Sequence, residues 1–405
     1  MHVASDCLAT LEYRLTWRSR DAEHEERFLA RKVNFWRDVF PPRMAEALQG
    51  LDQGRSVTLE YAPGEALPRR DPSLVHRLSP ADFRHLAVSG RSIAPRPGRW
   101  YPRGLFNGLP GVFISDMRPA LLRSLDDSAL VADLNHPLAD TPFTLTATVL
   151  NVARKDCETG GRLSHWLDEL CCYGPGMQEQ RVAGRFPLSV DEDASAYARP
   201  DEADDALFHA EPRLVGHVDA QASQHLKDMA RPLLQPGARV LDLMASYETH
   251  APRDMDLEVA GLGLNTAEME ANPALNSHVV HDLNQAPVLP FGDRAFDAVV
   301  CDLSVEYLLR PVQVLKEAAR VLRPGGMIRI AFSNRWFPAK VTALWPDLHE
   351  FERQGLVLDW LRAADGFTGC STQSVRNWWR PEDDPHIRQT WISDPVYAVT
   401  ARRES

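Results

Sequence analysis

The alternation of buried strands and helices in residues 238–334 restricts the fold more than any other feature. Near-continuous apolar segments such as "ARVLDLM", "LEVAGLGLN", "FDAVVCDLS" and "MIRIAFSN" occur in a region that also holds the helix-like "PVQVLKEAARVLRPGG". Strands that are apolar on both faces are typical of a parallel sheet covered by helices on both sides. Such sheets bind ligands beyond the carboxyl ends of their strands. The segments of interest are therefore 242–247, 263–265, 282–284 and 302–307.

Residues 1–153 have a different texture, with short strand-like runs separated by proline and glycine. In "TPFTLTATVLNV" (141–152), Phe143, Leu145, Ala147 and Val149 occupy alternate positions. That period of two predicts a strand with one buried face. The segment "PRMAEALQG" predicts a helix over 42–50, with proline before its first turn and glycine at its end.

Residues 154–211 are predicted to connect the two halves. The stretch "DEDASAYARPDEADDA" (191–206) carries many acids and one arginine, which indicates a solvated linker. The next stretch, "PRLVGHVDAQASQHLKDMARPLLQPG" (212–237), has apolar residues at helical spacing and predicts a helix at the start of a domain that covers 212–405.

Composition excludes several classes of protein. The formal net charge of −11 over 405 residues disfavours nucleic acid as a partner. The sequence has no charged-then-apolar leader and no apolar run near 18 residues, so we expect a cytoplasmic protein that does not enter a membrane. Its six cysteines form no C-x-x-C pair, which favours reduced thiols over a metal site.

The second half resembles the class I S-adenosylmethionine-dependent methyltransferases, which have a Rossmann-like α/β fold. The segments "LPFGDRAFDAVVCDLSVEYL" (289–308) and "VLKEAARVLRPGGMIRIAFSN" (314–334) carry the resemblance, in the right order over about 130 residues. The resemblance implies S-adenosylmethionine as the cofactor and methyl transfer as the activity.

The predicted cofactor residues depart from the usual pattern of that family. Its first strand runs into an acid, here Asp242, and then into glycines that let the backbone approach the cofactor. Here Met244, Ala245, Ser246 and Tyr247 replace those glycines, and Gly263 stands where an acid usually holds the ribose. Two interpretations remain open: a rebuilt cofactor site, or a retained fold without cofactor. Under the first, the cofactor-binding residues are Asp242, Met244, Ala245, Ser246, Gly263, Asn265 (which replaces the lost acid), Asp282 (at the adenine) and Leu283.

Methyl transfer requires an acceptor in line with the sulfonium methyl, and a base where the acceptor carries a proton. Glu306 and Tyr307 follow a strand and are predicted catalytic residues. His250 is interpreted as a surface-loop histidine that could instead act as a base. In "SNRWFP" (333–338), Arg335 could bind an acidic acceptor, although a structural aromatic cluster with a salt bridge explains this segment equally well.

The first half resembles the FKBP-type peptidyl-prolyl isomerases, most closely their SlyD-like branch, whose domain has an antiparallel α+β fold. The segments "VFPPRMAEAL" and "ADLNHPLADTPFTLTATVLNV" carry the resemblance over about 150 residues, with residues 69–130 as an inserted flap domain. The resemblance implies a proline-containing peptide or protein as partner and an apolar pocket that favours the twisted amide.

Position by position, the resemblance places Tyr13, Phe40, Tyr61 and Leu145 in that pocket. Pro42 replaces the glycine of the family, and Leu145 stands where an aromatic residue is common. Three hypotheses follow: a methyltransferase whose FKBP-like domain binds a protein or peptide acceptor, a prolyl isomerase or chaperone with a silent methyltransferase domain, and a scaffold without either activity.

Overall fold

The computed structural model describes residues 1–85, 87–88, 91–92, 94–157, 161–179 and 194–405. The chain forms two compact units. Unit 1 comprises Met1–Arg20, His24–Glu192 and Asp347–Gly355, and unit 2 comprises Asp21–Glu23, Asp193–Pro346 and Leu356–Ser405. This division differs from the predicted boundaries, because residues 193–211 group with unit 2 and residues 347–355 with unit 1.

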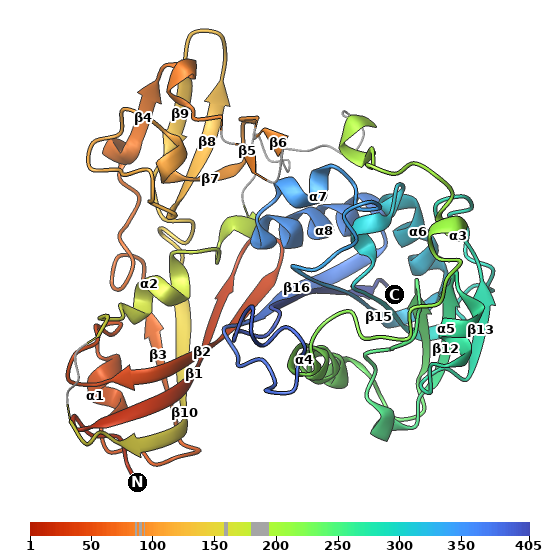
Figure 1. Ribbon diagram of the computed structural model, residues 1–405, viewed down its shortest axis with the longest axis horizontal. Helices are drawn as coiled ribbons and strands as arrows, with labels where there is room; N and C mark the ends of the chain where they lie inside the picture. Colours follow the sequence, from red (N-terminus) through yellow and green to blue (C-terminus); the bar gives the residue numbers. More distant parts are fainter. Residues whose placement is uncertain (86, 89–90, 93, 158–160, 180–193) are drawn as a thin grey trace. The chain divides into compact units, whose positions relative to one another are not determined.

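The larger sheet of unit 1 is antiparallel where its registers are defined (Figure 1). Its strands lie in the order β2-β1-β10-β3, with bounds β2 (Glu23–Asn34), β1 (Cys7–Arg18), β10 (Phe143–Arg154) and β3 (Ser56–Tyr61). The predicted alternation on β10 is confirmed, since Phe143, Leu145, Ala147 and Val149 are all buried. Helices α1 (Met44–Leu48) and α2 (Trp166–Cys171) add side chains to the same core.

A second, smaller sheet in unit 1 has its own core. Its strands are β4 (Val75–Leu78), β9 (Leu130–Asp133), β8 (Pro119–Leu125) and β7 (Trp100–Pro102), and the pair β5 (Ala87–Val88) and β6 (Arg91–Ser92) forms a separate ribbon. Phe83 packs edge-on against Tyr101 and Phe106, with ring centroids 5.1 and 5.4 Å away. Strands β4, β7 and β8 fall within residues 69–130, the region predicted as an inserted flap, whereas β9 begins at the last residue of that region.

The segment 347–355 is joined to the rest of unit 1 by a buried ion pair. The Nε atom of Arg99 lies 2.9 Å from a carboxylate oxygen of Glu352, and both side chains are almost fully buried. The same oxygen accepts a hydrogen bond from the backbone nitrogen of Trp100 at 3.1 Å. Breaking such a pair would leave one charge buried without compensation, so this contact holds the segment in place.

Unit 2 contains the predicted parallel sheet. Its strand order is β13-β12-β11-β14-β15-β17-β16, with bounds β13 (Ser277–Val280), β12 (Glu258–Gly263), β11 (Arg239–Leu243), β14 (Phe296–Asp302), β15 (Leu322–Ser333), β17 (Val396–Arg403) and β16 (Phe367–Arg376). The five strands from β13 to β15 are parallel, and β17 is antiparallel to both of its neighbours. Strand order reverses between β11 and β14, which is the switch point where a ligand is expected.

Helices of unit 2 connect and cover these strands: α3 (Asp205–Phe208), α4 (Ala220–Ala230), α5 (Thr266–Glu270) and α6 (Pro311–Val321) (Figure 1). After β15 come α7 (Leu344–Asp347), whose last residue groups with unit 1, and α8 (Glu350–Ala364), which begins in unit 1 and belongs to unit 2 from Leu356 onward. The predicted helix over 212–237 is shorter than expected. Asp219 caps α4 by accepting hydrogen bonds from the backbone nitrogens of Gln221 and Ala222. Residues 212–219 therefore precede the helix and are not helical.

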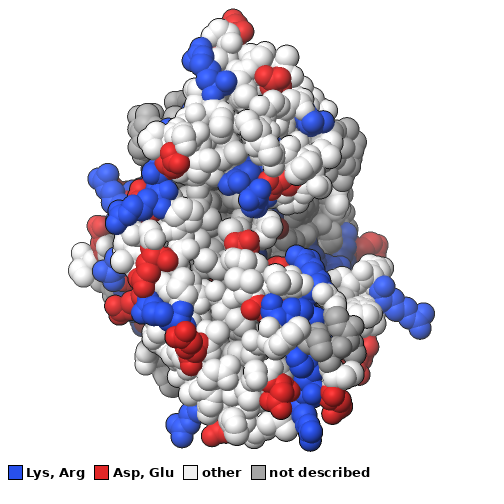
Figure 2. Space-filling model, turned by 90° about the vertical axis from the view of Figure 1, so that its left-hand side faces the viewer, with Lys and Arg blue, Asp and Glu red and all other residues white. Residues whose placement is uncertain are grey.

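Surface charge is mixed on the face shown in Figure 2, where lysine and arginine side chains alternate with aspartate and glutamate. Within the described residues, no helix combines the length and the apolar character that crossing a membrane requires. The described part of the chain also contains no group of three or more His, Cys, Asp or Glu side chains arranged to hold a metal ion.

Candidate functional site

The turn after β11 has the shape of a glycine turn without a glycine. Met244 adopts a left-handed backbone conformation with φ of 58°, which glycine adopts without strain and other residues rarely do. The next residue, Ala245, donates a backbone hydrogen bond of 2.8 Å to the carbonyl of Leu262 on β12. Strain of this kind is often retained at functional sites, so the conformation of Met244 supports a rebuilt turn.

Glycines on β12 allow this turn to approach the sheet. A Cβ atom placed on Gly263 would lie 2.1 Å from the carbonyl oxygen of Ala245, which is far inside any real contact. At Gly261 a Cβ atom would lie 3.2 Å from the Cβ atom of Ala245. The close approach is thus made possible by Gly261 and Gly263 on the neighbouring strand, whereas the turn itself contains no glycine. An acid at position 263 would not fit, which explains why the usual ribose-binding acid is missing there.

Hydrogen bonds of Asn265 and Glu268 connect the end of β12 and the start of α5 to residues 209–213. The side-chain oxygen of Asn265 accepts a hydrogen bond from the backbone of Glu268 at 3.0 Å, and its amide nitrogen donates to the carbonyl of His209 at 2.7 Å. Glu268 accepts hydrogen bonds from the Ser246 hydroxyl at 2.5 Å and from the backbone nitrogen of Arg213 at 2.7 Å. Asn265 thus lines the pocket with both polar groups already engaged, and its role at the ribose stays a prediction.

The ends of β13 and β14 complete the floor of the pocket. Asp282 accepts a hydrogen bond of 2.8 Å from the backbone nitrogen of Asn284, and Leu283 beside it is buried. After β14, Leu303 adopts a second left-handed conformation, with φ of 56°. All eight predicted cofactor-binding residues line this single pocket: Asp242, Met244, Ala245, Ser246, Gly263, Asn265, Asp282 and Leu283.

Buried polar groups in the pocket are only partly satisfied. Burial raises the pKa of Asp242 to about 7, although the Thr249 hydroxyl donates a hydrogen bond of 2.6 Å to its carboxylate. Asp302 pairs with Arg329 through one carboxylate oxygen, and its other oxygen is buried without a hydrogen-bond partner among the described residues. A polar ligand in the pocket would satisfy such atoms.

His250 is buried in the pocket and is not the surface-loop histidine that the sequence suggested. Its Nδ1 atom lies 3.6 Å from Asp302 and its Nε2 atom 3.8 Å from Glu248. Neither ring nitrogen forms a hydrogen bond within the described residues. Burial lowers the pKa of His250, so the imidazole is neutral near pH 7 and able to accept a proton.

A segment that the sequence assigned to a linker and a helix covers the pocket. Asp205 in α3 accepts hydrogen bonds from Arg199 at 2.9 Å and from the side chain of Asn284 at 2.9 Å, and it lies 3.2 Å from the ammonium of Lys340. Residues 191–193 of the predicted linker lie outside the described residues. The described part, from residue 194 onward, is folded onto unit 2 because its acids have specific basic partners.

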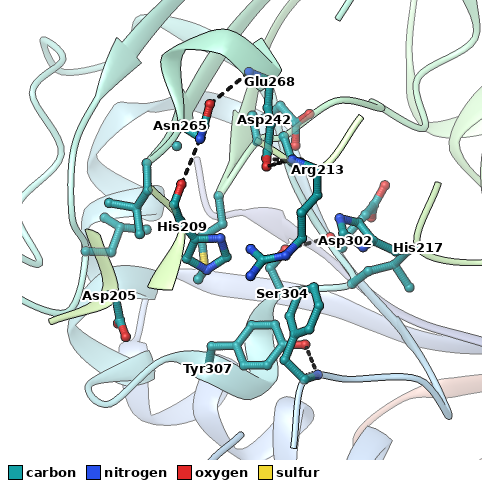
Figure 3. Close-up of a pocket in the computed structure, with 18 of the residues that line it drawn as sticks. Asp205, His209, Arg213, His217, Asp242, Asn265, Glu268, Asp302, Ser304 and Tyr307 are labelled. Carbon is teal, nitrogen blue, oxygen red and sulfur yellow. Dashed lines mark hydrogen bonds between the residues drawn. The ribbon is translucent and has the colours of Figure 1, made fainter. Parts of the chain in front are cut away.

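Residues 208–217 supply basic and aromatic side chains that the sequence reasoning missed. Arg213 lies over the rings of Phe208 and Phe337, at 4.6 and 5.2 Å from their centroids. His209 and His217 contact the ring of Phe337 edge-on. Figure 3 shows both histidines near Arg213. The signal that could have found them is a cluster of one arginine and two histidines directly before a capped helix.

Of the other residues predicted to act near the methyl acceptor, one lines the pocket and two do not. Tyr307 lines the pocket, and its hydroxyl accepts a hydrogen bond of 2.8 Å from the backbone nitrogen of Phe337. Glu306 is fully buried and does not line the pocket. Arg335 also lies outside the lining; it is exposed, with Asp394 at 3.5 Å and His386 at 3.4 Å. The basic residue in the pocket is instead Arg213.

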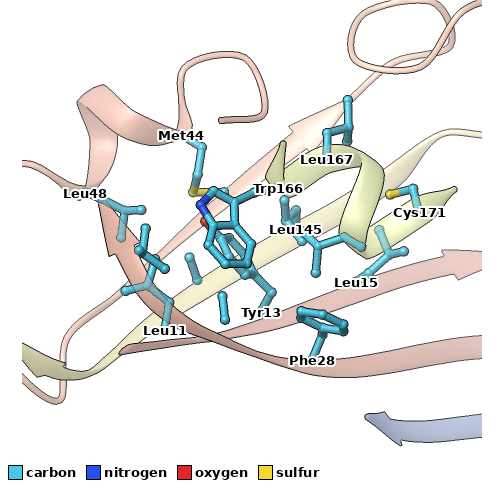
Figure 4. Packing of buried hydrophobic residues seen from close by; sticks show 14 of the residues in the cluster. Leu11, Tyr13, Leu15, Phe28, Met44, Leu48, Leu145, Trp166, Leu167 and Cys171 are labelled. Carbon is cyan, nitrogen blue, oxygen red and sulfur yellow. The ribbon is translucent and has the colours of Figure 1, made fainter. Parts of the chain in front are cut away.

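The predicted isomerase residues of unit 1 lie in its hydrophobic core. Tyr13, Tyr61 and Leu145 are buried to within 1% of full burial, and Trp166 from α2 packs beside Tyr13 with ring centroids 6.5 Å apart (Figure 4). The Tyr61 hydroxyl donates a hydrogen bond of 2.7 Å to the carbonyl of Pro42. Phe40 is partly buried and stacks on Phe35. Among the described residues, Tyr13, Tyr61 and Leu145 therefore belong to the core, Phe40 packs against it, and their role in a peptide pocket stays a prediction.

Residues 249–330, which contain strands β12, β13 and β14, match the family described as "Methyltransferase domain". Demethylmenaquinone methyltransferase of Renibacterium salmoninarum is 31% identical over 105 residues, which are 25% of this chain and 44% of that protein. The enzyme of the same name from Paenarthrobacter aurescens is 27% identical over 164 residues, 39% of this chain and 61% of that protein. The chain thus spans about half the length of these curated relatives.

Among solved structures, a SAM-dependent methyltransferase from Thermotoga maritima is similar to this chain, with 15% identity and a TM-score of 0.33, over 45% of this chain and 91% of that one. The family match of residues 249–330 indicates a methyltransferase domain in unit 2, and S-adenosylmethionine is the cofactor that such a domain implies. The pocket fits this cofactor in its chemistry, because it combines a glycine-lined strand end, a buried carboxylate and unpartnered polar atoms.

Proposed function

We propose that unit 2 binds S-adenosylmethionine in this pocket and transfers the methyl group to an acceptor that lies beside Phe337. The observation that carries the proposal is the convergence of all eight predicted cofactor-binding residues on one pocket at the switch point of the sheet. Three segments of sequence that are far apart meet there: the turn after β11, the end of β12 and the loop after β13. This favours the interpretation of a rebuilt cofactor turn over that of a lost site.

Asp242, the turn at Ala245 and Ser246, and the loop at Asp282 and Leu283 would hold the cofactor. When bound, the cofactor supplies an electrophilic methyl group on a sulfonium. The chain itself has to position the acceptor, keep water out and take up a proton where the acceptor carries one. His250 suits the last task, since its buried neutral ring lies between the carboxylates of Glu248 and Asp302, which stabilise the imidazolium that forms.

Calorimetric titration with S-adenosylmethionine and S-adenosylhomocysteine tests the proposal. We expect saturable binding that is lost in Asp242→Ala and kept in Asp254→Ala. Asp254 is a matched control because it is an acid of the same unit whose exposed side chain pairs with Arg231. Absence of binding of either ligand to the unsubstituted protein would contradict the proposal.

Methyl acceptors can then be compared with labelled cofactor. Demethylmenaquinone is the substrate in the names of the curated relatives, and a proline-containing peptide is the acceptor class suggested by the resemblance of unit 1. Transfer of label to one of them would assign the acceptor class. Prolyl isomerase activity in unit 1 stays a prediction that rests on the sequence resemblance.

A further inference from the structure

Arg213 places a guanidinium group inside the pocket of unit 2 (Figure 3). Its Nη2 atom donates a hydrogen bond of 3.1 Å to the carbonyl of Phe208. Its Nη1 atom is buried and has no hydrogen-bond partner within the described residues. A buried donor of this kind loses its hydration without compensation, which favours binding of a group that accepts a hydrogen bond.

No carboxylate of the described residues forms an ion pair with this guanidinium. The nearby acids are engaged elsewhere, since Asp205 binds Arg199 and Asn284, and Glu268 binds Ser246 and the backbone nitrogen of Arg213. The charge of Arg213 therefore faces the pocket without a direct counter-ion. Arginine presents a planar pair of donors that matches a carboxylate, and this pairing is stronger than a neutral hydrogen bond.

Aromatic rings fix the orientation of the guanidinium and border the space around it. Phe208 and Phe337 lie 4.6 and 5.2 Å from its central carbon, and Tyr307 packs against Phe337 with centroids 6.0 Å apart. Because the guanidinium lies over these rings, little side-chain freedom is left to lose when an anion binds. A ligand that reaches Arg213 would also contact apolar ring surface.

His209 and His217 complete this side of the pocket. No hydrogen bond involving the ring nitrogens of either histidine forms within the described part of the chain, although both rings pack on Phe337. Burial lowers the pKa of both imidazoles, and Arg213 lowers it further. Neutral rings add polar groups to the pocket without adding a second positive charge.

We propose that Arg213 binds a carboxylate of the methyl acceptor, whose apolar, planar body lies against Phe337 and Tyr307. This assignment rests on the proposed function and adds a substrate class to it: a small carboxylate-bearing compound with a flat apolar body. Arg213 would be a binding residue for the acceptor, and it would act on affinity for the acceptor without acting on affinity for the cofactor.

Titration with four probes separates the two possible sources of a carboxylate. S-adenosylhomocysteine carries the amino-acid carboxylate of the cofactor, and methylthioadenosine lacks it. Benzoate is a carboxylate on a flat apolar body, and benzamide has the same shape without the charge. Each probe is titrated into the full-length protein, into Arg213→Met and into Arg323→Met, with benzoate and benzamide added to protein saturated with S-adenosylhomocysteine.

Arg323→Met is the matched control, because Arg323 pairs with Asp297 at the edge of the sheet opposite the pocket. We expect Arg213→Met to weaken benzoate binding at least about tenfold. Binding of S-adenosylhomocysteine and methylthioadenosine should stay within about twofold of the unsubstituted protein. Benzamide should bind all three proteins weakly and equally, since it lacks the charge that Arg213 recognises.

Other outcomes would overturn the assignment in distinguishable ways. A loss of S-adenosylhomocysteine affinity in Arg213→Met, with methylthioadenosine unchanged, would mean that Arg213 binds the carboxylate of the cofactor. Binding of S-adenosylhomocysteine without any binding of benzoate to the unsubstituted protein would refute the acceptor class and leave the methyltransferase proposal intact. No binding of S-adenosylhomocysteine or S-adenosylmethionine at all would refute the proposed function itself.

Discussion

The side chains that the sequence placed at a pocket lie in a filled core in unit 1 and around an open pocket in unit 2. Tyr13 and Leu145 of unit 1 are fully buried among apolar neighbours. Asp242 of unit 2 is also buried and Asp302 is partly buried, but both line a cavity, and one carboxylate oxygen of Asp302 has no hydrogen-bond partner among the described residues. The two units thus use buried positions for different purposes: close packing in one, and a preorganised polar surface in the other.

This difference shows which residue types in a sequence indicate a binding site. An aromatic or aliphatic side chain fits a core and an apolar pocket equally well, because both environments exclude water. A carboxylate at the end of a parallel strand has no such ambiguity, since burying it without a partner is costly. The polar strand ends of unit 2 were therefore better guides to a pocket than Tyr13 and Leu145 of unit 1.

Gly263→Ala should have the largest effect, and it would break the pocket of unit 2. The added Cβ atom would lie 2.1 Å from the carbonyl oxygen of Ala245, so either the turn or the strand has to move. We expect unit 2 to lose about 3 kcal/mol of stability and the protein to lose binding of S-adenosylhomocysteine. Urea unfolding and calorimetry measure both effects.

Gly292→Ala is the control for that experiment, because a Cβ atom at Gly292 meets nothing within 4 Å. It should leave both stability and ligand binding unchanged. Unchanged binding in Gly263→Ala would mean that the close approach of the turn to β12 is not needed for the site.

Asp242→Asn should have an intermediate effect that depends on pH. Burial raises the pKa of Asp242 to about 7, from about 4 in an unfolded chain. Between these values the folded state holds a proton that the unfolded state has lost, so this carboxyl lowers stability as the pH rises and its effect levels off above pH 7. Asparagine does not titrate, so we expect the variant to be more stable than the unsubstituted protein at pH 8 and nearly unchanged in stability near pH 4.

The measurement is urea unfolding at pH 4 and pH 8, with hydrogen exchange of the β11 peptide to identify the unfolding of unit 2. Binding of S-adenosylhomocysteine should fall in the same variant, which would show that the buried charge is retained for ligand binding at a cost in stability. Equal stability of both proteins at pH 8 would argue against a raised pKa for Asp242.

Tyr13→Phe should have the smallest effect, and it tests whether Tyr13 is a core residue of unit 1. The Tyr13 hydroxyl is buried without a hydrogen-bond partner among the described residues, so its removal should raise stability by up to about 1 kcal/mol. Isomerisation of a Phe-Pro test peptide should proceed at the same rate with either protein, because the hydroxyl is out of reach of a peptide. Isomerase activity that disappears in Tyr13→Phe would restore the pocket predicted from the FKBP resemblance.

Much of unit 2 could be predicted from its sequence. The apolar strands, the amphipathic helix before "LRPGG" and the polar strand ends led to the parallel sheet and to the cofactor-side residues, since these features depend on local periodicity and on the geometry of parallel strands. The helix predicted over 212–237 is confirmed only for Ala220–Ala230, because the Asp219 cap starts α4 later than the apolar spacing suggested. Because of that error, Arg213 and His217 were not predicted as pocket residues.

The sequence by itself determined the alternation of strands and helices, the faces of β10 and the set of polar residues at the strand ends, because each of these depends on spacing along the chain. Only the tertiary structure decided that Gly263 replaces the glycines of the turn after β11, that Trp166 closes the core around Tyr13, and that Arg213 faces the pocket. These three facts depend on close approach between segments far apart in sequence. Such contacts are set by the packing of the whole unit and leave no periodic signal in the chain.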